Sequence, residues 1–420
     1  MISKDKALEE HKNRKGKYEI VSKAPLSTRD ELSTFYTPGV AFVSSAIKEN
    51  PAGAYEYTSK GNTIAIVSDG TRVLGLGDIG PQAGLPVMEG KAILFKKFGG
   101  VDAVPLCIAT KDEAEIVRLV VEIAPTFGAI NIEDIESPKS FRIVDALSKS
   151  LDIPVFHDDQ QGTGVVVLAA LLNSLKLAEK GKDARIVING AGSAGLGIVR
   201  LLSHAGFKNL LVVDSAGAIY KGRPDNMNEF KEEIADATNA ERLQGTLDEA
   251  VRGADVLIGV SKKGMFTKET IAKMGAKPIV FALANPEPEI EYEEAKAAGA
   301  FIAATGRSDT PNQVNNVLAF PSIMRGLLDA RARGLNYEIL EAAATAIAKS
   351  TGKELGIDRI LPDPLERKTA VRVASNVAAA VVAASVRTGL ARLQADPKEV
   401  KRQTAERIRR YWKMEKRILK

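Results

Sequence analysis

The 420-residue sequence predicts an α/β protein with two domains and a helical C-terminal region. Short apolar runs alternate with helical stretches over most of the chain, which is typical of parallel sheets covered by helices. A glycine-rich turn joins a strand to a helix at 190–195, and the chain becomes almost wholly helical after Pro311. We place an N-terminal α/β domain at 1–160, a doubly wound parallel domain with returning helices at 161–390, and a basic terminal helix at 391–420.

The first domain is expected to mix short strands with helices. Its strands are predicted from short apolar runs at 63–67, 92–95, 103–108, 129–132 and 154–157. Its helices are predicted at 40–48, 112–124 and 138–150. The last of these helices joins the last two strands in a β-α-β unit, whose right-handed crossover makes the two strands parallel.

Two acidic pairs follow the two strands of this unit. Glu133 and Asp134 end the first strand, and Asp158 and Asp159 end the second. Because the carboxyl ends of parallel strands share one edge, we expect the four carboxylates to meet there. Such a cluster is costly without a cation, and hard oxygen ligands favour Mg²⁺ or Mn²⁺ over zinc. Helix capping or surface acid would explain a single pair, but the repeated pair favours a metal site.

The second domain begins with a long apolar helix, predicted at 164–180, that connects it to the first. Its strands are predicted at 185–188, 210–213, 255–260, 278–283 and 300–304. Ala-rich helices at 339–349 and 369–387 are expected to pack back on the core. The regular alternation of strand and helix predicts a doubly wound parallel sheet.

The turn after the first strand of this domain reads Gly-Ala-Gly-Ser-Ala-Gly. In a strand-turn-helix context this is the fingerprint of a Rossmann dinucleotide-binding fold. Gly190 permits the tight turn, Gly192 lets the backbone approach a pyrophosphate, and Gly195 allows close helix packing. Ser193 and Ala194 lie in the same turn, before a helix predicted at 196–204 whose N–H groups and dipole attract phosphate.

The acid at the end of the next strand, Asp214, bears on the choice of dinucleotide. An acid in this place accepts hydrogen bonds from the adenosine ribose and repels a 2′-phosphate, which favours NAD over NADP. Lys221 and Arg223 follow closely and leave NADP possible.

Three residues of the first domain are candidates for acid–base chemistry and substrate binding. Lys91 precedes an apolar run and is expected to be partly buried, which would lower its pKa toward that of a useful base. Tyr36 lies beside a Pro-Gly turn, and Arg72 lies in a glycine-dense loop where it could clamp a carboxylate. The alternatives are that Lys91 is a solvated surface lysine, that Tyr36 is a structural ring, and that Arg72 forms an ordinary salt bridge in a turn.

Amide side chains are expected at the ligand crevice of the second domain. Asn285 closes the strand at 278–283, and Asn315 and Asn316 open a later helix. Amides at such ends face the crevice of a doubly wound sheet, although asparagine is also a common capping residue.

Charge and composition exclude several other classes of protein. The net charge is +5, but residues 398–420 hold ten basic and three acidic residues, so the remaining chain is close to neutral and is no phosphate-binding surface. We expect the tail to dock as an amphipathic helix; a partner or dimer contact comes second, and RNA third. The single Cys107 excludes an internal disulfide, and the charged start and interrupted apolar runs predict neither secretion nor a membrane span.

Taken together and in order, these segments resemble malic enzyme in its shorter microbial form, without an added acetyltransferase-like domain. The resemblance covers roughly 26–387. Its motifs lie at 36–40, 68–78, 90–91, 131–134, 156–163, 190–195, 284–286 and 315–317. It implies oxidative decarboxylation of (S)-malate to pyruvate and CO₂, with reduction of NAD or NADP, by a cytoplasmic homodimer or higher homo-oligomer.

The resemblance also implies roles for individual residues. Tyr36 would be the general acid, Lys91 the general base and Arg72 the carboxylate anchor. The implied metal ligands are Glu133, Asp134 and Asp159, with Asp158 as a supporting acid. The implied contacts with substrate and nicotinamide come from Asn285, Asn315 and Asn316.

Two other interpretations stay open at this point. A non-decarboxylating NAD-dependent 2-hydroxyacid or amino-acid dehydrogenase would share the dinucleotide fold but would not require three carboxylate ligands. A non-catalytic binding or nucleic-acid-associated protein would rely on the basic tail. Loss of activity with a chelator would exclude the first, and unchanged turnover after deletion of the tail would exclude the second.

Overall fold

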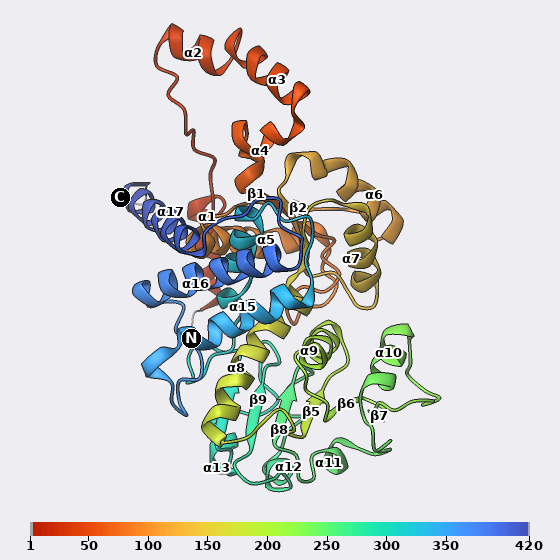
Figure 1. Ribbon diagram of the computed structural model, residues 1–420. Helices are drawn as coiled ribbons and strands as arrows, with labels where there is room; N and C mark the ends of the chain where they lie inside the picture. Colours follow the sequence, from red (N-terminus) through yellow and green to blue (C-terminus); the bar gives the residue numbers. More distant parts are fainter. Residues whose placement is uncertain (1–2, 419–420) are drawn as a thin grey trace.

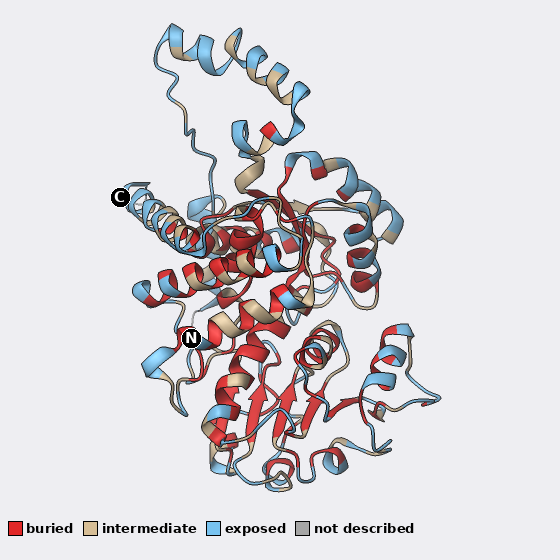
Figure 2. Cartoon of the chain, viewed as in Figure 1, coloured by how far each residue is buried: buried red, intermediate tan, exposed pale blue. Residues whose placement is uncertain are grey.

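The structure, a computed structural model, describes residues 3–418 and contains two sheets, one above the other in Figure 1. The last two residues of the expected terminal helix lie outside the described residues. Figure 2 shows that burial follows the sheets and the helices between them. The predicted two-domain α/β fold with a helical C-terminus is confirmed.

The first sheet is formed by the N-terminal half and has the parallel strand order β2-β1-β3-β4. Its strands are β1 (Thr63–Ser68), β2 (Asp102–Cys107), β3 (Ala129–Ile132) and β4 (Val155–His157). Every residue of β1, β3 and β4 is buried. Strands covered on both faces need no alternation of polar and apolar residues, which explains their continuous apolar runs.

The second sheet has the strand order β10-β9-β8-β5-β6-β7, and only the short β7 among the described strands runs antiparallel to its neighbour. Its strands are β5 (Ile186–Asn189), β6 (Leu210–Asp214), β7 (Gly217–Ala218), β8 (Val256–Gly259), β9 (Ile279–Ala282) and β10 (Ile302–Thr305). The order reverses between β5 and β8, so a crevice for a ligand is expected at the carboxyl ends of these strands.

Helices cover both sheets. Those of the N-terminal half are α1 (Lys4–Arg14), α2 (Arg29–Phe35), α3 (Gly39–Glu49), α4 (Ala54–Tyr57), α5 (Gly80–Leu94), α6 (Glu113–Ile123) and α7 (Lys139–Ser150). Those around the second sheet are α8 (Thr163–Ala178), α9 (Ser193–His204), α10 (Glu229–Ala237), α11 (Leu247–Ala250), α12 (Lys268–Ala272) and α13 (Tyr292–Ala297). The C-terminal helices are α14 (Phe320–Asp329), α15 (Tyr337–Ser350), α16 (Arg367–Arg387) and α17 (Pro397–Ile418).

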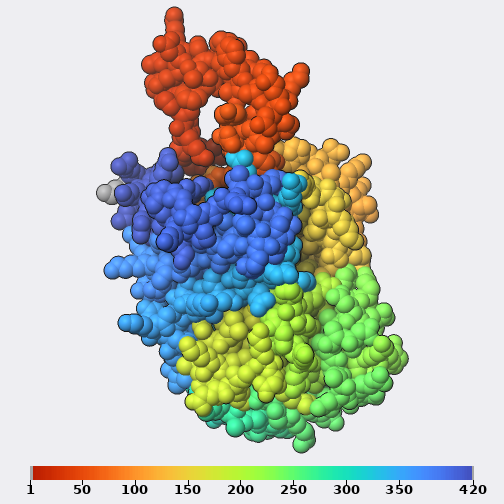
Figure 3. All heavy atoms as spheres, in the orientation of Figure 1, coloured from red at the N-terminus to blue at the C-terminus, as the bar shows by residue number. Residues whose placement is uncertain are grey.

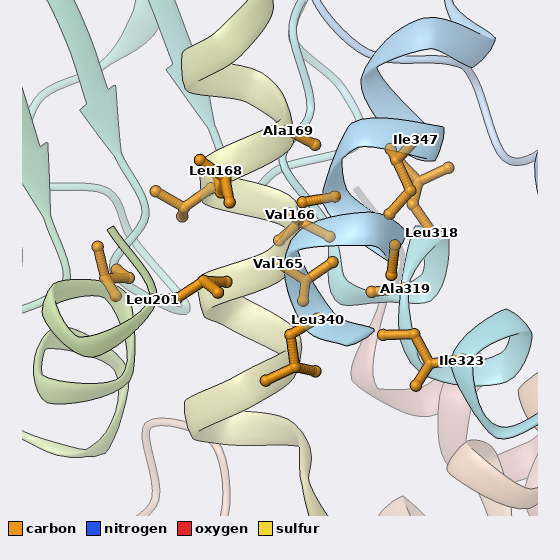
Figure 4. Packing of buried hydrophobic residues seen from close by; sticks show 14 of the residues in the cluster. Val165, Val166, Leu168, Ala169, Leu201, Leu318, Ala319, Ile323, Leu340 and Ile347 are labelled. Atoms are coloured by element: carbon orange, nitrogen blue, oxygen red, sulfur yellow. The ribbon is translucent and has the colours of Figure 1, made fainter. Parts of the chain in front are cut away.

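Helix α8 is the central helix of the molecule. Figure 4 shows it between α9 on one side and α14 and α15 on the other, with Val165, Val166 and Leu168 among the packed side chains. The segment that contains α8 and the helix α16 are each long and apolar enough to cross a membrane, but 72% of each apolar window is buried inside the fold. Their hydropathy is therefore that of core helices.

The terminal helix α17 docks on the body, as expected from its apolar stripe. Val400, Thr404 and Ile408 are buried, and Trp412 Nε1 donates a hydrogen bond to the carbonyl of Lys97 at 3.1 Å. Ile418, at the end of the same stripe, is 48% exposed. The basic residues lie mostly on the opposite, solvated face.

One segment projects from the body. Helices α2 and α3, which we call the arm, have no buried residue although the structure describes them completely. Figure 1 shows the arm far above the sheets, and Figure 3 shows it as a separate lobe. Its exposed apolar side chains include Leu32, Phe35 and Phe42, at 51%, 50% and 77%. Exposed apolar side chains gathered in this way mark an interaction surface.

One predicted strand is wrong. Residues 92–95 do not form a strand but complete α5 and begin a π-helical turn at Phe95–Gly99. A run of four apolar residues has no period of its own, and helix and strand cannot be told apart from it. Lys91 therefore lies in the last turn of a helix.

Candidate active site

Three carboxylates meet at the carboxyl edge of the first sheet. Glu133 and Asp134 follow β3, Asp159 follows β4, and one oxygen from each lies within 4.8 Å of the others. The backbone N–H of Asp134 donates to Asp159 Oδ2 at 3.1 Å. The parallel pairing of β3 and β4 brings the two acidic pairs together as predicted. All the donors are oxygens, which suits Mg²⁺ or Mn²⁺.

The cluster carries more negative charge than its neighbours neutralise. Burial, together with the nearby acids, raises the pKa of Glu133 well above its usual value although Lys91 opposes the shift. Burial and Asp159 raise the pKa of Asp134 to about 8. Among the described residues, Asp134 Oδ2 and Asp158 Oδ1 are buried without a hydrogen-bond partner. A divalent cation would satisfy both the charge and the free oxygen of Asp134, so the donor set fits the expected metal.

Lys91 reaches this cluster from the last turn of α5. Its Nζ lies 2.8 Å from Glu133 Oε1 and 2.6 Å from Asp158 Oδ2, and it sits 4.3 Å from the centre of the Phe320 ring. The side chain is 12% exposed, so the expected partial burial is confirmed. The expected lowering of its pKa is not found: burial acts to lower it, but the charges of Asp158 and Glu133 outweigh burial and raise it.

Asp158 is a buried partner of Lys91 and not one of the three clustered ligands. Asn316 Nδ2 donates to Asp158 Oδ2 at 3.2 Å and to Thr163 Oγ1 at 3.0 Å. A Cβ on Gly162 would lie 1.8 Å from Asp158 Oδ1, so only glycine fits beside this carboxylate. Asn316 and Gly162 therefore hold Asp158 against Lys91.

The other candidates for substrate contact lie at loop and strand ends. Arg72 is exposed on the loop after β1, and its backbone N–H donates to the carbonyl of Asp134 at 3.0 Å. Asn285 is exposed directly after β9, in contact range of the loop at Gly75. Asn315 Oδ1 accepts a hydrogen bond from the Val317 N–H at 2.9 Å, so it also serves as a cap.

A buried ion pair that we did not expect from the sequence fixes the Arg72 loop. Lys139 Nζ lies 2.6 Å from Asp69 Oδ2, and both side chains are almost fully buried. Asp69 Oδ1 also accepts from the N–H and hydroxyl of Thr71, the residue before Arg72. The two partners are 70 residues apart, and no local pattern in the sequence pairs them.

The glycine turn has the geometry that a dinucleotide needs. Gly190 has a φ of +123°, and a Cβ there would lie 2.7 Å from the Val260 carbonyl. A Cβ on Gly195 would lie 1.8 Å from the Gly190 carbonyl, which confirms its packing role. A Cβ on Gly192 would meet nothing within 4 Å, so this side of the turn is open to a ligand at the start of α9. Ser193 and Ala194 form the first turn of that helix.

Asp214 ends β6 as predicted, but its carboxylate is not free. Arg223 binds both oxygens, at 2.9 and 2.7 Å, and Lys231 Nζ lies 2.8 Å from Oδ2. Lys221 instead forms an exposed pair with Asp236. The argument for NAD from a free carboxylate at Asp214 therefore does not hold in this geometry.

Tyr36, the predicted general acid, lies outside this cluster. It lies between α2 and α3 on the arm and is 65% exposed. Figure 1 shows the arm far from α5 and α7, the helices that flank the carboxylates. Within one chain, the described structure does not bring Tyr36 to Lys91.

Comparison with known proteins identifies the family. A family model described as "Malic enzyme, N-terminal domain" matches residues 15–148, and one described as "Malic enzyme, NAD binding domain" matches residues 160–386. The chain belongs to the malic enzyme family.

Malic enzymes of known name and structure align with almost all of the chain. The Bacillus subtilis (strain 168) bifunctional malic/malolactic enzyme is 50% identical over 406 residues, which cover 96% of this chain and 98% of the relative. The NAD-dependent malic enzyme of Geobacillus stearothermophilus is 52% identical over 379 residues, covering 90% and 78%. The crystal structure of malic enzyme from Pyrococcus horikoshii Ot3 superposes with a TM-score of 0.93 at 47% identity, covering 97% and 96%.

The activity follows from this membership. The protein oxidatively decarboxylates malate, with NAD or NADP as the hydride acceptor and a divalent metal ion. The activity predicted from the resemblance is confirmed, and the non-decarboxylating dehydrogenase is not favoured.

Proposed function

We propose that malate is oxidised and decarboxylated at the cluster formed by Glu133, Asp134, Asp159 and Lys91. The proposal rests on one observation: three carboxylate oxygens lie within 4.8 Å of one another, and the Lys91 ammonium group touches one of these carboxylates. The metal ion and the group that accepts the malate hydroxyl proton must lie next to each other. Among the described residues, no other group of three possible metal ligands lies this close together.

Glu133, Asp134 and Asp159 would hold Mg²⁺ or Mn²⁺. When bound, the ion would draw electron density from the malate oxygens and stabilise the negative charge that CO₂ loss leaves behind. Asn131 Nδ2 donates to Glu133 Oε2 at 2.8 Å, and this hydrogen bond fixes the orientation of one proposed ligand.

Lys91 would accept the proton of the C2 hydroxyl as hydride leaves C2. Asp158, held by Asn316, would orient the Lys91 side chain. The Lys91 amine must be neutral when it accepts the hydroxyl proton. Glu133 is shared between Lys91 and the ligand set, so its use as a ligand leaves Lys91 with Asp158 as its remaining carboxylate partner. Loss of one carboxylate partner lowers the pKa of a lysine.

Substrate and dinucleotide would approach from opposite sides of this cluster. Arg72 is exposed beside Asp134 and suits a malate carboxylate, because a guanidinium binds such a group with two hydrogen bonds. The open turn at Gly192 suits the pyrophosphate, and the nicotinamide accepts the hydride. Asn285 with Asn315 or Asn316 would contact substrate and nicotinamide between the two.

We further propose that the working unit is a homodimer in which the arm covers the active site of the other copy. The arm exposes apolar side chains and Tyr36, whereas the cluster has no tyrosine hydroxyl among its described hydrogen-bond partners. The partner subunit's Tyr36 would then protonate C3 and complete pyruvate. This arrangement would account for the exposed apolar side chains of the arm and for the absence of a general acid near the carboxylate cluster within one described chain.

Each part of the chain has a proposed role. Residues 1–160 would bind metal and malate, 161–390 would bind the dinucleotide, and 391–420 would stabilise the body through α17. We propose that the enzyme works in the cytoplasm, acts only on small molecules, and engages neither nucleic acid nor membrane.

A direct assay tests the proposed site. Malate should cause reduction of NAD or NADP only when Mn²⁺ or Mg²⁺ is present, and Glu133→Gln should abolish it. The product should be pyruvate. Activity that survives a chelator and yields oxaloacetate would instead support a non-decarboxylating dehydrogenase.

A further inference from the structure

The loop that carries Arg72 is closed at its base by its own backbone. The N–H groups of Ile79 and Gly80 both donate to the carbonyl of Gly70, at 3.1 and 3.2 Å. Gly70 has a φ of +71°, and a Cβ there would lie 2.3 Å from the Gly80 carbonyl oxygen. Arg72 lies two residues inside this closure. The way in which the closed end is held against the body therefore decides where Arg72 lies.

Side chains from α7 and from the loop after β3 hold this closed end. Lys139, in the first turn of α7, places its Nζ 2.6 Å from Asp69 Oδ2 and 3.5 Å from Glu136 Oε1. Thr71 Oγ1 accepts the N–H of Glu136 at 3.0 Å, and its hydroxyl donates to Asp69 Oδ1 at 2.6 Å. These contacts fix the chain directly before Arg72.

The ion pair between Lys139 and Asp69 is buried. The Lys139 side chain is 9% exposed, and that of Asp69 is fully buried. Loss of the ammonium group would leave a buried carboxylate without its cation, which costs much more than loss of an exposed pair. Movement of Asp69 toward solvent relieves this cost and carries Thr71 and Arg72 with it. Arg72 is exposed, so its backbone and not its packing sets where the guanidinium lies.

We propose that Lys139 is a positioning residue for malate: through Asp69 and Thr71 it holds Arg72 where the guanidinium binds a malate carboxylate. The proposal rests on the proposed role of Arg72 as the carboxylate anchor. A pair of parallel hydrogen bonds requires one position and one angle of the guanidinium, so a small shift of the loop weakens substrate binding. Lys139 itself contacts neither Lys91 nor the three clustered carboxylates through any described hydrogen bond or ion pair.

Steady-state kinetics of malate oxidation at saturating Mn²⁺ and dinucleotide test the proposal. Lys139→Met, which keeps most of the side-chain length, should raise the KM for malate about tenfold or more and lower kcat less than about threefold. Arg72→Ala should lower kcat/KM for malate at least as much. The variant that combines both changes should have a kcat/KM within about twofold of that of Arg72→Ala, because Lys139 acts through Arg72.

Thr71→Val tests the same link at a second contact, also if Lys139→Met fails to fold. The change keeps the side-chain shape but removes the hydroxyl that joins Asp69 to the Glu136 N–H. It should raise the KM for malate about threefold or more. An unchanged KM in Thr71→Val would contradict the proposal.

Lys149→Met is the matched control, because Lys149 is an exposed lysine in the last turn of the same helix. It should change KM and kcat by less than about twofold. Calorimetry should give Lys139→Met a Mn²⁺ affinity within about twofold of the wild-type value, and a loss as large as the rise in KM would show that Lys139 supports the carboxylate cluster instead.

The combined variant gives the decisive comparison. If Lys139→Met lowers kcat/KM by the same factor with and without the Arg72 guanidinium, Lys139 does not act through Arg72 and the proposal is overturned. If Arg72→Ala alone leaves kcat/KM unchanged, the proposed anchor is wrong, and the role of Lys139 falls with it.

Discussion

Asp159 is the proposed metal ligand that connects the carboxyl ends of β3 and β4. It is the most exposed of the three clustered carboxylates and accepts the N–H of Asp134. Asp159→Asn replaces an anionic ligand with a neutral amide of the same shape, so we predict that Mn²⁺ affinity falls by more than about tenfold and turnover is lost. Asp236→Asn, at an exposed acid, should leave both unchanged. Unchanged Mn²⁺ binding in calorimetry would remove Asp159 from the ligand set.

Lys91 and Tyr36 are predicted to act on different steps. Lys91→Ala should impair hydride transfer from malate but retain some metal-dependent decarboxylation of added oxaloacetate. Tyr36→Phe should retain hydride transfer but exchange the methyl protons of pyruvate with deuterated water poorly. General acids and bases contribute about 10² to 10⁴ in rate, so each defect should exceed tenfold. Fast proton exchange by Tyr36→Phe would contradict its role as the acid.

The raised pKa of Asp134, about 8, predicts how metal-free protein responds to pH. Folded Asp134 keeps a proton that the unfolded chain has released above about pH 4, so the free energy of unfolding falls as pH rises toward 8. Burial lowers the pKa of His157, which acts in the opposite direction but only below about pH 6.5. In thermal melts from about pH 6.5 to 8.5, we expect the Tm of metal-free protein to fall and excess Mn²⁺ to suppress the fall.

Asp134→Asn provides the control for this pH effect. The amide cannot ionise, so the fall in Tm should be clearly smaller than in the wild-type protein. A wild-type Tm that rises over the same range in the absence of metal would show that Asp134 is already ionised in the folded state.

Among the helices, α17 packs against the body and contributes no residue to the proposed active site. Ile408 is fully buried against Val371 and Ala374 of α16. We predict that Ile408→Ala lowers the free energy of unfolding by about 2–4 kcal/mol and leaves kcat nearly unchanged below the new Tm. Ile418→Ala, at an exposed position of the same helix, should cost less than about 0.5 kcal/mol. Equal Tm values for the two variants in thermal melts would contradict the docking of α17.

Elements with a clear period or fingerprint could be predicted from the sequence. The strand at 129–132 and the one predicted at 154–157, observed as Val155–His157, are short apolar runs with a helix between them, and their parallel pairing follows from the handedness of the crossover. The glycine turn likewise needs one backbone conformation, and the structure has it at Gly190. The predicted pairing of the two strands is what brings Glu133 and Asp134 next to Asp159.

Features that depend on contacts between distant segments could not be predicted. The saturation of Asp214 requires Lys231 from α10, and the Arg72 loop requires Lys139, 70 residues from its partner Asp69. The four apolar residues at 92–95 are too few to show a period, so the sequence does not distinguish a helix from a strand there. The sequence predicts a helix at 40–48, observed as α3, but nothing in it shows that this helix projects from the body.

In the whole molecule, one copy of the chain does not bring together all the groups that we propose for the reaction. The cluster around Lys91 is assembled from α5, β3 and β4, whereas Tyr36 lies on the arm that extends from the body (Figure 1). The arm exposes Phe35 and Phe42, and exposed apolar side chains gathered in this way mark a surface that binds another. The proposed twofold dimer would provide the covering surface on both copies at once, because each arm would meet the same face of its partner.

A mixing experiment tests this central claim most directly. Lys91→Ala and Tyr36→Phe chains with different tags are co-expressed, and the mixed dimers are purified by both tags. If each site combines Lys91 of one copy with the partner subunit's Tyr36, one of the two sites in a mixed dimer is intact. Steady-state formation of pyruvate from malate, which needs both residues, should then return to about half the wild-type rate per dimer. If Lys91 and Tyr36 of each site come from the same copy, one site of the mixed dimer lacks Lys91 and the other lacks Tyr36. Mixed dimers no more active than either variant alone would contradict the account.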